Sequence, residues 1–300
     1  MIDATRLAWN RYWYAPDAAL NLAMARILAA GTAFWLLLSR DPSGISGLGS
    51  VFWAGVPEST RWRYLLFPGH ERLEHLLVLI AAAALLGALI GVFPRLCSFI
   101  AALLLYHLAP LDGIIWNSTP MAGGLTMPTL ALLLCAVAPS GDALSWRARG
   151  ATQRSWAYGW PLRLLQVWLI QVYFFAALAK VRLNGLGWAS SENMSNWLYA
   201  FTQSEGHAVY SQLGGWIAAQ PWLAGAVGAG TLVFEFGVIV ALFSARWRPW
   251  VAASAVLFHV GIYFALNITF NGWPLMLTFV DWENLLRRAS PPSNAPRNAS

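Results

Sequence analysis

Charged residues are scarce in this sequence. Asp, Glu, Lys and Arg together make up 11% of its 300 residues, whereas hydrophobic residues make up 58%. A soluble domain usually has about 25% charged and about 45–50% apolar residues. The mean hydropathy is +0.53. So little charge cannot cover the surface of a water-soluble protein, and we therefore expect an integral membrane protein whose first partner is the lipid bilayer.

Several other absences exclude function classes. The only two cysteines, Cys97 and Cys135, lie in apolar stretches, so neither a structural disulfide nor an iron–sulfur site is expected. The phosphate loop, the dinucleotide fingerprint and the G-x-S-x-G motif are all missing. No segment alternates with period two, which argues against strands. The net charge of +6 is interpreted as arginine biased to one membrane face, and no nucleic-acid partner is expected.

What the sequence has in abundance is long apolar runs and 18 tryptophans, a residue that gathers where hydrocarbon meets headgroups. The runs predict an all-α, polytopic membrane bundle of about eight transmembrane helices. The expected spans are Leu20–Leu38, Leu73–Val92, Leu96–Trp116, Met121–Ala138, Pro161–Arg182, Trp222–Phe243, Trp250–Leu266 and Trp273–Leu286.

The arginine distribution predicts that both termini face the cytoplasm. With the N-terminus inside, the two short outer loops, Asn117–Pro120 and Asn267–Gly272, contain no Lys or Arg, and every short inner segment contains Arg. We expect a bacterial inner (plasma) membrane protein with no cleaved signal peptide. Its parts are a cytoplasmic or interfacial segment (1–19), a transmembrane domain (20–286) and a disordered cytoplasmic tail (287–300).

Lys180 is the first candidate functional residue. Gln166, Tyr173 and Lys180 are spaced by seven residues and therefore form one polar stripe on a helix. Counted from Leu162 at about 1.5 Å per residue, Lys180 lies close to the outer membrane surface. A lysine in a poorly hydrated site can lose its proton and act as a base. The alternative is a lysine that extends from the helix end to the headgroups.

Three further ionisable residues are expected at similar depth. Glu235 and His259 lie on consecutive spans, about equally far from the turn that joins them, and could form a carboxylate–imidazole pair for proton transfer or a structural hydrogen bond. Together with His107 they could in principle ligate a metal, but equal depth is weak evidence because helix rotation is unknown. No metal is predicted.

Two other charged features have structural interpretations. Arg26, near the inner end of the first span, is expected to extend towards the headgroups. The run from His70 to His75 has Glu where both zinc-protease motifs need His, and its acidic residues instead suit the first turn of a helix.

These residues resemble a known family. Tyr173-Phe-Phe-Ala-Ala-Leu-Ala-Lys180-Val, followed by Gly187-Trp188, resembles the core motif of the HTTM (horizontally transferred transmembrane domain) family, which includes the vitamin K-dependent γ-carboxylases. Four more segments agree with it in the same order. They are the Gly87–Arg95 turn, Trp116-Asn117, Phe234-Glu235-Phe236 and Leu257-Phe258-His259.

The resemblance implies a function at the outer membrane face. It implies that Lys180 is a catalytic base, that Glu235 and His259 assist it, and that Tyr173, Trp116, Asn117, Trp188 and His107 bind the substrate. The implied cofactor is a reduced, vitamin K-like quinone. The carboxylases have a His soon after Trp-Asn and a large domain after the membrane part, whereas this sequence has neither. We therefore expect altered chemistry, on a quinone-like lipid or a secreted peptide.

Two other functions stay open. Small bacterial relatives that are similar to sporulation-delaying-protein B assist the maturation of secreted peptides together with a partner subunit. A non-catalytic scaffold or maturation partner is therefore the alternative. A small transporter is the third possibility, although few ionisable groups and no evident inverted repeat count against it.

Overall fold

The protein is described by a computed structural model that covers residues 2–40, 42–66, 69–115, 124–148, 153–203 and 209–289. Within these ranges the regular structure is helical, apart from one isolated bridge between Asp17 and Ser155. The elements are α1 (Ile2–Trp13), α2 (Ala19–Arg40), η1 (Pro42–Gly47), α3 (Ser50–Ala54), α4 (Glu58–Tyr64), α5 (Glu71–Ile90), α6 (Pro94–Ile115), α7 (Thr126–Val137), α8 (Trp156–Asn184), η2 (Gly185–Ala189), α9 (Ser191–Gln203), α10 (Leu213–Ala218), α11 (Pro221–Gly237), α12 (Val240–Phe243), η3 (Ala245–Trp247), α13 (Arg248–Leu266), η4 (Trp273–Phe279) and α14 (Trp282–Ala289).

The all-helical prediction is confirmed, and part of the expected span count is supported. Five helical segments in the described residues are long and apolar enough to cross a bilayer, namely Ala19–Gly47, Glu71–Ile90, Trp156–Ala189, Pro221–Phe243 and Ala245–Leu266. Two more expected spans contain shorter apolar helices, Pro94–Pro110 and Thr126–Val137. Helix α7 has 12 residues and is thus about 18 Å long, well short of a hydrocarbon core of about 30 Å.

The eighth expected span, Trp273–Leu286, is not one helix. It divides into η4, a seven-residue 3-10 helix, and α14, a polar amphipathic helix with Glu283 in its first turn. The two helices are separated at Val280 and Asp281, where the backbone becomes extended and Asp281 joins a polar network. Leu275, Met276 and Phe279 of η4 are buried within the protein, which accounts for the apolar character of the segment.

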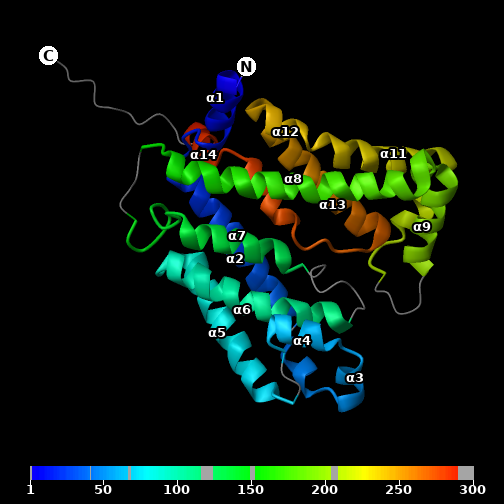
Figure 1. Ribbon diagram of the computed structural model, residues 1–300. Coiled ribbons are helices and arrows are strands. Elements are labelled where there is room, and N and C mark those ends of the chain that lie inside the picture. Colours follow the sequence, from blue (N-terminus) through cyan, green and yellow to red (C-terminus); the bar gives the residue numbers. More distant parts are fainter. Residues whose placement is uncertain are drawn as a thin grey trace.

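Helix α8 lies between two groups of helices (Figure 1). On one side, α2 packs against α5 and α7, and α6 packs against both α5 and α7. On the other side, α9 and α11 pack together beside the C-terminal half of α8, with α10 and α13 against α9. Small residues allow the close packing of α2, where Ala23, Ala29, Ala30 and Ala33 are fully buried. Figure 1 shows α1 and α14 at the same end of the molecule.

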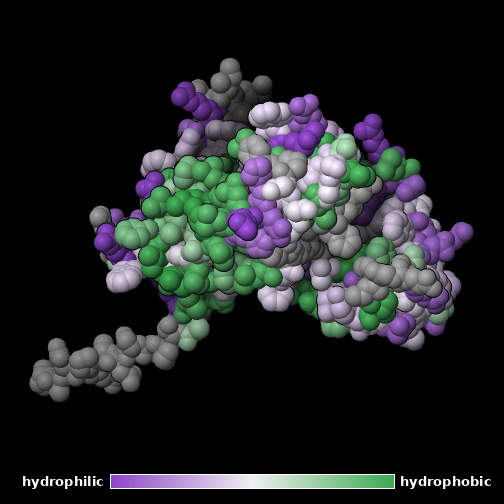
Figure 2. Space-filling model, turned by 90° about the horizontal axis from the view of Figure 1, so that it is seen from below, coloured by the Kyte–Doolittle hydropathy of each residue, from purple (hydrophilic) through white to green (hydrophobic). Residues whose placement is uncertain are grey.

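Apolar side chains cover a broad part of the outer surface, as expected for contact with lipid. Figure 2 shows hydrophobic residues gathered over the part of the molecule where α5 and α6 lie. Large exposed hydrophobic residues on these helices include Leu76, Leu79, Ile90, Leu96 and Leu103. A soluble monomer rarely exposes so large an apolar area, and the protein is therefore a multi-pass membrane protein.

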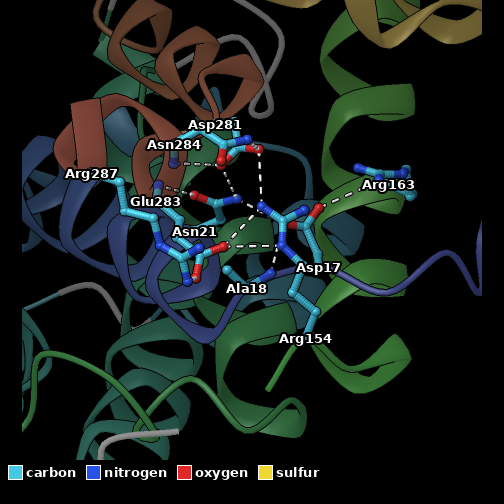
Figure 3. A network of polar contacts seen from close by, with 9 residues as sticks. All are labelled: Asp17, Ala18, Asn21, Arg154, Arg163, Asp281, Glu283, Asn284 and Arg287. Atoms are coloured by element: carbon cyan, nitrogen blue, oxygen red, sulfur yellow. Dashed lines mark hydrogen bonds and ion pairs between the residues drawn. The ribbon is translucent and has the colours of Figure 1, made fainter. Parts of the chain in front are cut away.

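A polar network joins α2, α8 and α14 at the end of the molecule where α1 lies (Figure 3). We call it the polar clasp. Asp17 exchanges two backbone hydrogen bonds with Ser155, and Arg154 makes ion pairs with Asp281 (3.2 Å) and Glu283 (2.8 Å). Burial by itself raises the pKa of Asp281, but hydrogen bonds from Asn284, Asn21 and Arg154 outweigh it, and the pKa lies below its ordinary value. The members are Asp17, Asn21, Arg154, Arg163, Asp281, Glu283, Asn284 and Arg287.

The expectation for Arg26 was wrong. Its side chain is fully buried, and the guanidinium donates hydrogen bonds to the carbonyl oxygens of Ser140 and Leu144. These residues lie in the turn that follows the C-terminal end of α7. Arg26 therefore holds α2 against the turn after α7 instead of reaching the headgroups.

Candidate functional site

A cavity of about 960 Å³ lies between α8, α9, α11 and α13. Its walls also include residues from α7, η2, α10 and the segment 268–273 that leads into η4. Most lining side chains are apolar or aromatic, with only a few polar groups. This composition is typical of a small-molecule site. Its aromatic lining consists of Trp168, Tyr173, Trp188, Trp197, Phe201, Phe258, Phe270 and Trp273.

An ion pair between α8 and α11 lies in the wall of the cavity. The Lys180 ammonium donates to both carboxylate oxygens of Glu235, with Nζ–Oε distances of 2.6 and 2.7 Å. The Glu235 side chain is 7% exposed and that of Lys180 is 25% exposed. The two residues face each other because α8 and α11 pack side by side. Removal of either partner would leave a largely buried charge without compensation.

Trp188 covers the other side of Lys180. The Lys180 Nζ lies 5.1 Å from the centroid of the Trp188 ring, within the range of a cation–π interaction. Asn193 holds η2 in place by donating to the Trp188 carbonyl oxygen at 2.6 Å. Gly228 of α11 allows η2 to approach, since a Cβ at this position would lie 2.9 Å from Ala189 Cα. The position of Trp188 therefore depends on a glycine of α11.

A second polar pair, Tyr173 and His259, lies in the same cavity wall. The Tyr173 hydroxyl oxygen is 3.2 Å from His259 Nε2, and His259 Nδ1 is 2.7 Å from the Ala255 carbonyl oxygen. The carbonyl oxygen is only an acceptor, so Nδ1 of a neutral imidazole donates to it. Nε2 then accepts the hydrogen of Tyr173. The Tyr173 oxygen keeps its lone pairs for another hydrogen-bond donor.

Aromatic rings fix both pairs in position. Phe234, next to Glu235, stacks on Phe258 at 4.3 Å between ring centroids and contacts the Tyr173 ring edge-on at 5.5 Å. The imidazole of His259 stacks on Trp273 of η4 at 6.1 Å. Because rings have few rotatable bonds, such packing orients the polar groups at a low entropic cost. Charges and donors therefore lie at fixed positions beside a large apolar space.

The other predicted site residues lie elsewhere. His107 is absent from the described cavity lining and bonds through Nε2 to Glu74 of α5 at 2.9 Å, so His107, Glu235 and His259 are not brought together. The described residues contain no group of three or more potential metal ligands. Gln166, on the predicted stripe, donates to the Thr278 carbonyl oxygen instead of facing the cavity. Trp116 and Asn117 fall outside the described residues.

The pairing of Glu74 with His107 was not predicted from the sequence. This side chain is fully buried and pairs with His107, although it was interpreted only as an acidic residue at the start of a helix. The spacing offers one clue. Glu74 lies seven residues before Ala81 and therefore on the same face of α5 as the buried Ala81, Ala84 and Ala88. A carboxylate on an otherwise apolar face suggests a buried partner.

A comparison with known families shows a match that covers most of the chain. The chain matches the HTTM domain over residues 14–281. Because this range covers most of the chain, the chain belongs to the HTTM family. The range also includes all the elements of the cavity. Comparisons with curated proteins and with solved structures gave no match.

Proposed function

We propose that this HTTM-family protein is a membrane enzyme that uses Lys180 as a base on a lipid-soluble molecule with a weakly acidic hydroxyl group. The observation that carries the proposal is the Lys180–Glu235 ion pair in the wall of an aromatic cavity of about 960 Å³. Catalytic bases lie where a titratable group and a specific charge partner meet in a cleft. A purely structural ion pair would not need such a space beside it.

Proton counting explains why Lys180 and Glu235 act together. An ammonium cannot accept a proton, so Lys180 must first give one up. With Glu235 Oε1 at 2.6 Å, the proton can move to the carboxylate and leave a neutral amine. The amine then accepts the proton of the substrate at Nζ. Each step moves the proton along a single hydrogen bond, so opposite charges never have to be separated over a longer distance.

A reduced quinone, which the family resemblance implies as cofactor, suits the residues present. Trp168, Trp188 and Trp273 offer flat apolar surfaces for a ring system, and the Tyr173 oxygen can accept a hydrogen bond from a ring hydroxyl. When bound, such a hydroquinone supplies the weakly acidic hydroxyl and the reducing equivalents. Glu235 would accept the Lys180 proton, Lys180 would take up the proton of the ring hydroxyl, and His259 would orient the Tyr173 hydroxyl.

A non-catalytic scaffold or partner in the maturation of a secreted peptide is the second candidate function. The favouring observation is that the same ion pair joins α8 to α11. If the pair only joins helices, Lys180 can be replaced without loss of function as long as the fold persists. The two candidates therefore differ in the expected behaviour of Lys180.

Amine labelling tests the enzyme proposal directly, because Lys180 is the only lysine of the sequence. Purified protein is treated with an amine-reactive reagent, with and without reduced 2-methyl-1,4-naphthoquinone, and the modified peptides are measured by mass spectrometry. At a concentration about tenfold above its Kd, we expect the hydroquinone to slow the labelling of Lys180 by about tenfold. The N-terminal amine is the internal control, and its labelling stays unchanged.

Naphthalene, which lacks hydroxyl groups, is the control ligand and should protect Lys180 far less. Equal labelling with and without the hydroquinone would contradict the enzyme proposal. So would a Lys180→Met variant that retains full biological function at wild-type abundance. Either outcome would favour the scaffold.

A further inference from the structure

A group of polar side chains extends from the polar clasp, with which it shares Arg163 and Asp17, at the opposite end of α8 from Lys180. Arg163 Nη2 is 3.3 Å from Asp17 Oδ2, and Arg163 Nη1 is 3.4 Å from Gln166 Oε1. Arg248, the first residue of α13, donates only to the Ala241 carbonyl oxygen, at 3.3 Å. Charge-assisted hydrogen bonds are usually about 2.7–2.9 Å long. Both guanidinium groups therefore have long contacts only.

Helix α1, which carries Tyr12, packs against α8, and the Tyr12 hydroxyl oxygen is buried without a hydrogen-bond partner among the described residues. Burial raises the pKa of Tyr12, and the positive charges of Arg248 and Arg163 oppose that rise. Since an unpaired buried hydroxyl costs about 1–3 kcal/mol, native proteins rarely keep one. A hydroxyl donor beside two guanidinium groups is a suitable set of donors for an anion.

Charge balance supports the same conclusion. In the neighbouring clasp, the positive charges of Arg154 and Arg287 are matched by Asp281 and Glu283. Among the described residues, the carboxylate next to Arg163 and Arg248 is that of Asp17. Its Oδ1 already accepts hydrogen bonds from the Ala18 amide and from Asn21, at 2.8 and 2.7 Å. One positive charge thus remains without a described counterion.

Tryptophans indicate the depth of the cluster in the membrane. Trp9, Trp156, Trp247 and Trp250 are exposed, and they lie on α1, at the start of α8, on η3 and at the start of α13. Exposed tryptophans on a membrane protein mark the headgroup level. These are the elements that carry Tyr12, Arg163 and Arg248. The cluster therefore lies at the level of lipid phosphates.

We propose that Tyr12, Arg163 and Arg248 form a binding site for a phosphate group, which at this depth belongs to an anionic phospholipid. Two guanidinium groups bind phosphate oxygens by paired hydrogen bonds, and the Tyr12 hydroxyl donates a further one. A bound lipid would join α1, α8 and α13 at the membrane surface. This site does not depend on the chemistry of the cavity.

The test uses purified full-length protein in neutral detergent. Phosphatidylglycerol, phosphatidylcholine or inorganic phosphate is added, the midpoint of thermal unfolding is measured, and bound lipids are counted by native mass spectrometry. We expect phosphatidylglycerol alone to raise the midpoint, by about 2–4 °C, and to remain bound in the gas phase. Arg248→Gln and Tyr12→Phe, which leave the Arg163–Asp17 pair intact, should abolish this shift.

Arg246→Gln is the matched control, since Arg246 is exposed on η3 two residues before Arg248. We expect this variant to keep its phosphatidylglycerol affinity within about twofold, whereas Arg248→Gln should lose about tenfold. A shift by inorganic phosphate alone that disappears in Arg248→Gln would identify a free phosphate as the ligand of the same site. Equal phosphatidylglycerol shifts in all variants, or no shift with either anion, would overturn the proposal.

Discussion

The two ends of α8 hold buried charges in contrasting ways. At the clasp end, Arg163 pairs with Asp17, whose carboxylate also accepts hydrogen bonds from Asn21 and a backbone amide. Seventeen residues later, Lys180 and Glu235 bond to each other and otherwise face a cavity of about 960 Å³. Several partners on one carboxylate suit a structural role for Asp17, whereas an ion pair beside free space suits the binding of a ligand in the cavity. The difference predicts which changes affect stability and which affect function.

The largest expected effect on stability is at Asp17. Asp17→Asn removes the carboxylate that faces Arg163, a side chain only 9% exposed, and leaves a buried guanidinium without its ion pair. We expect a loss of about 3–5 kcal/mol of unfolding free energy, measured by thermal unfolding in detergent. Hydroquinone protection of Lys180 in the fraction that remains folded should change by less than about twofold, because the cavity lies elsewhere.

Glu192→Gln is the control for loss of a single negative charge. Glu192 is exposed in the first turn of α9, and this change should cost less than about 0.5 kcal/mol. A similar small effect for Asp17→Asn would mean that the clasp does not hold the helices together. The contrast between the two ends of α8 would then be lost.

A smaller effect is expected from acid at the same end of the molecule. The folded-state pKa of Asp281 lies below that of the unfolded chain, so its stabilising contribution is complete above the unfolded value. It is lost as pH falls below about 4, towards the lower folded value. Asp281→Asn should therefore reduce the acid sensitivity of thermal unfolding between about pH 4 and pH 2. An unchanged pH profile in this variant would show that Arg154 and Asn21 do not stabilise the Asp281 carboxylate.

Sequence periodicity predicted the helices well but not their rotation. The spacing of seven residues placed Tyr173 and Lys180 on one face of α8, and both line the cavity. Equal depth suggested that Glu235 and His259 might pair with each other. Their actual partners, Lys180 and Tyr173, come from α8, which lies between the two groups of helices. Which side chains meet depends on helix rotation, and depth along each helix does not contain that information.

Apolar composition was also an incomplete guide to spans. Residues 273–279 are apolar because η4 is buried inside the protein, with Leu275 and Met276 fully covered. Burial against protein and burial in lipid select the same residue types, so hydropathy cannot separate them. Arg26 illustrates the converse, because a lone arginine near a span end can be buried and bonded to carbonyl oxygens of the turn after another helix. The HTTM resemblance, by contrast, was predicted correctly from the motif around Lys180.

The central claim is that Lys180 and Glu235 perform chemistry and do not merely join α8 to α11. The most direct test replaces both residues, as Lys180→Met with Glu235→Met, since exchange of a buried ion pair for apolar side chains of similar volume is often neutral or stabilising. We expect this double variant to unfold at or above the wild-type temperature, yet to support less than about 1% of the wild-type protein's function in the cell. A stable double variant with full function in the cell would contradict the claim and identify the pair as a structural link.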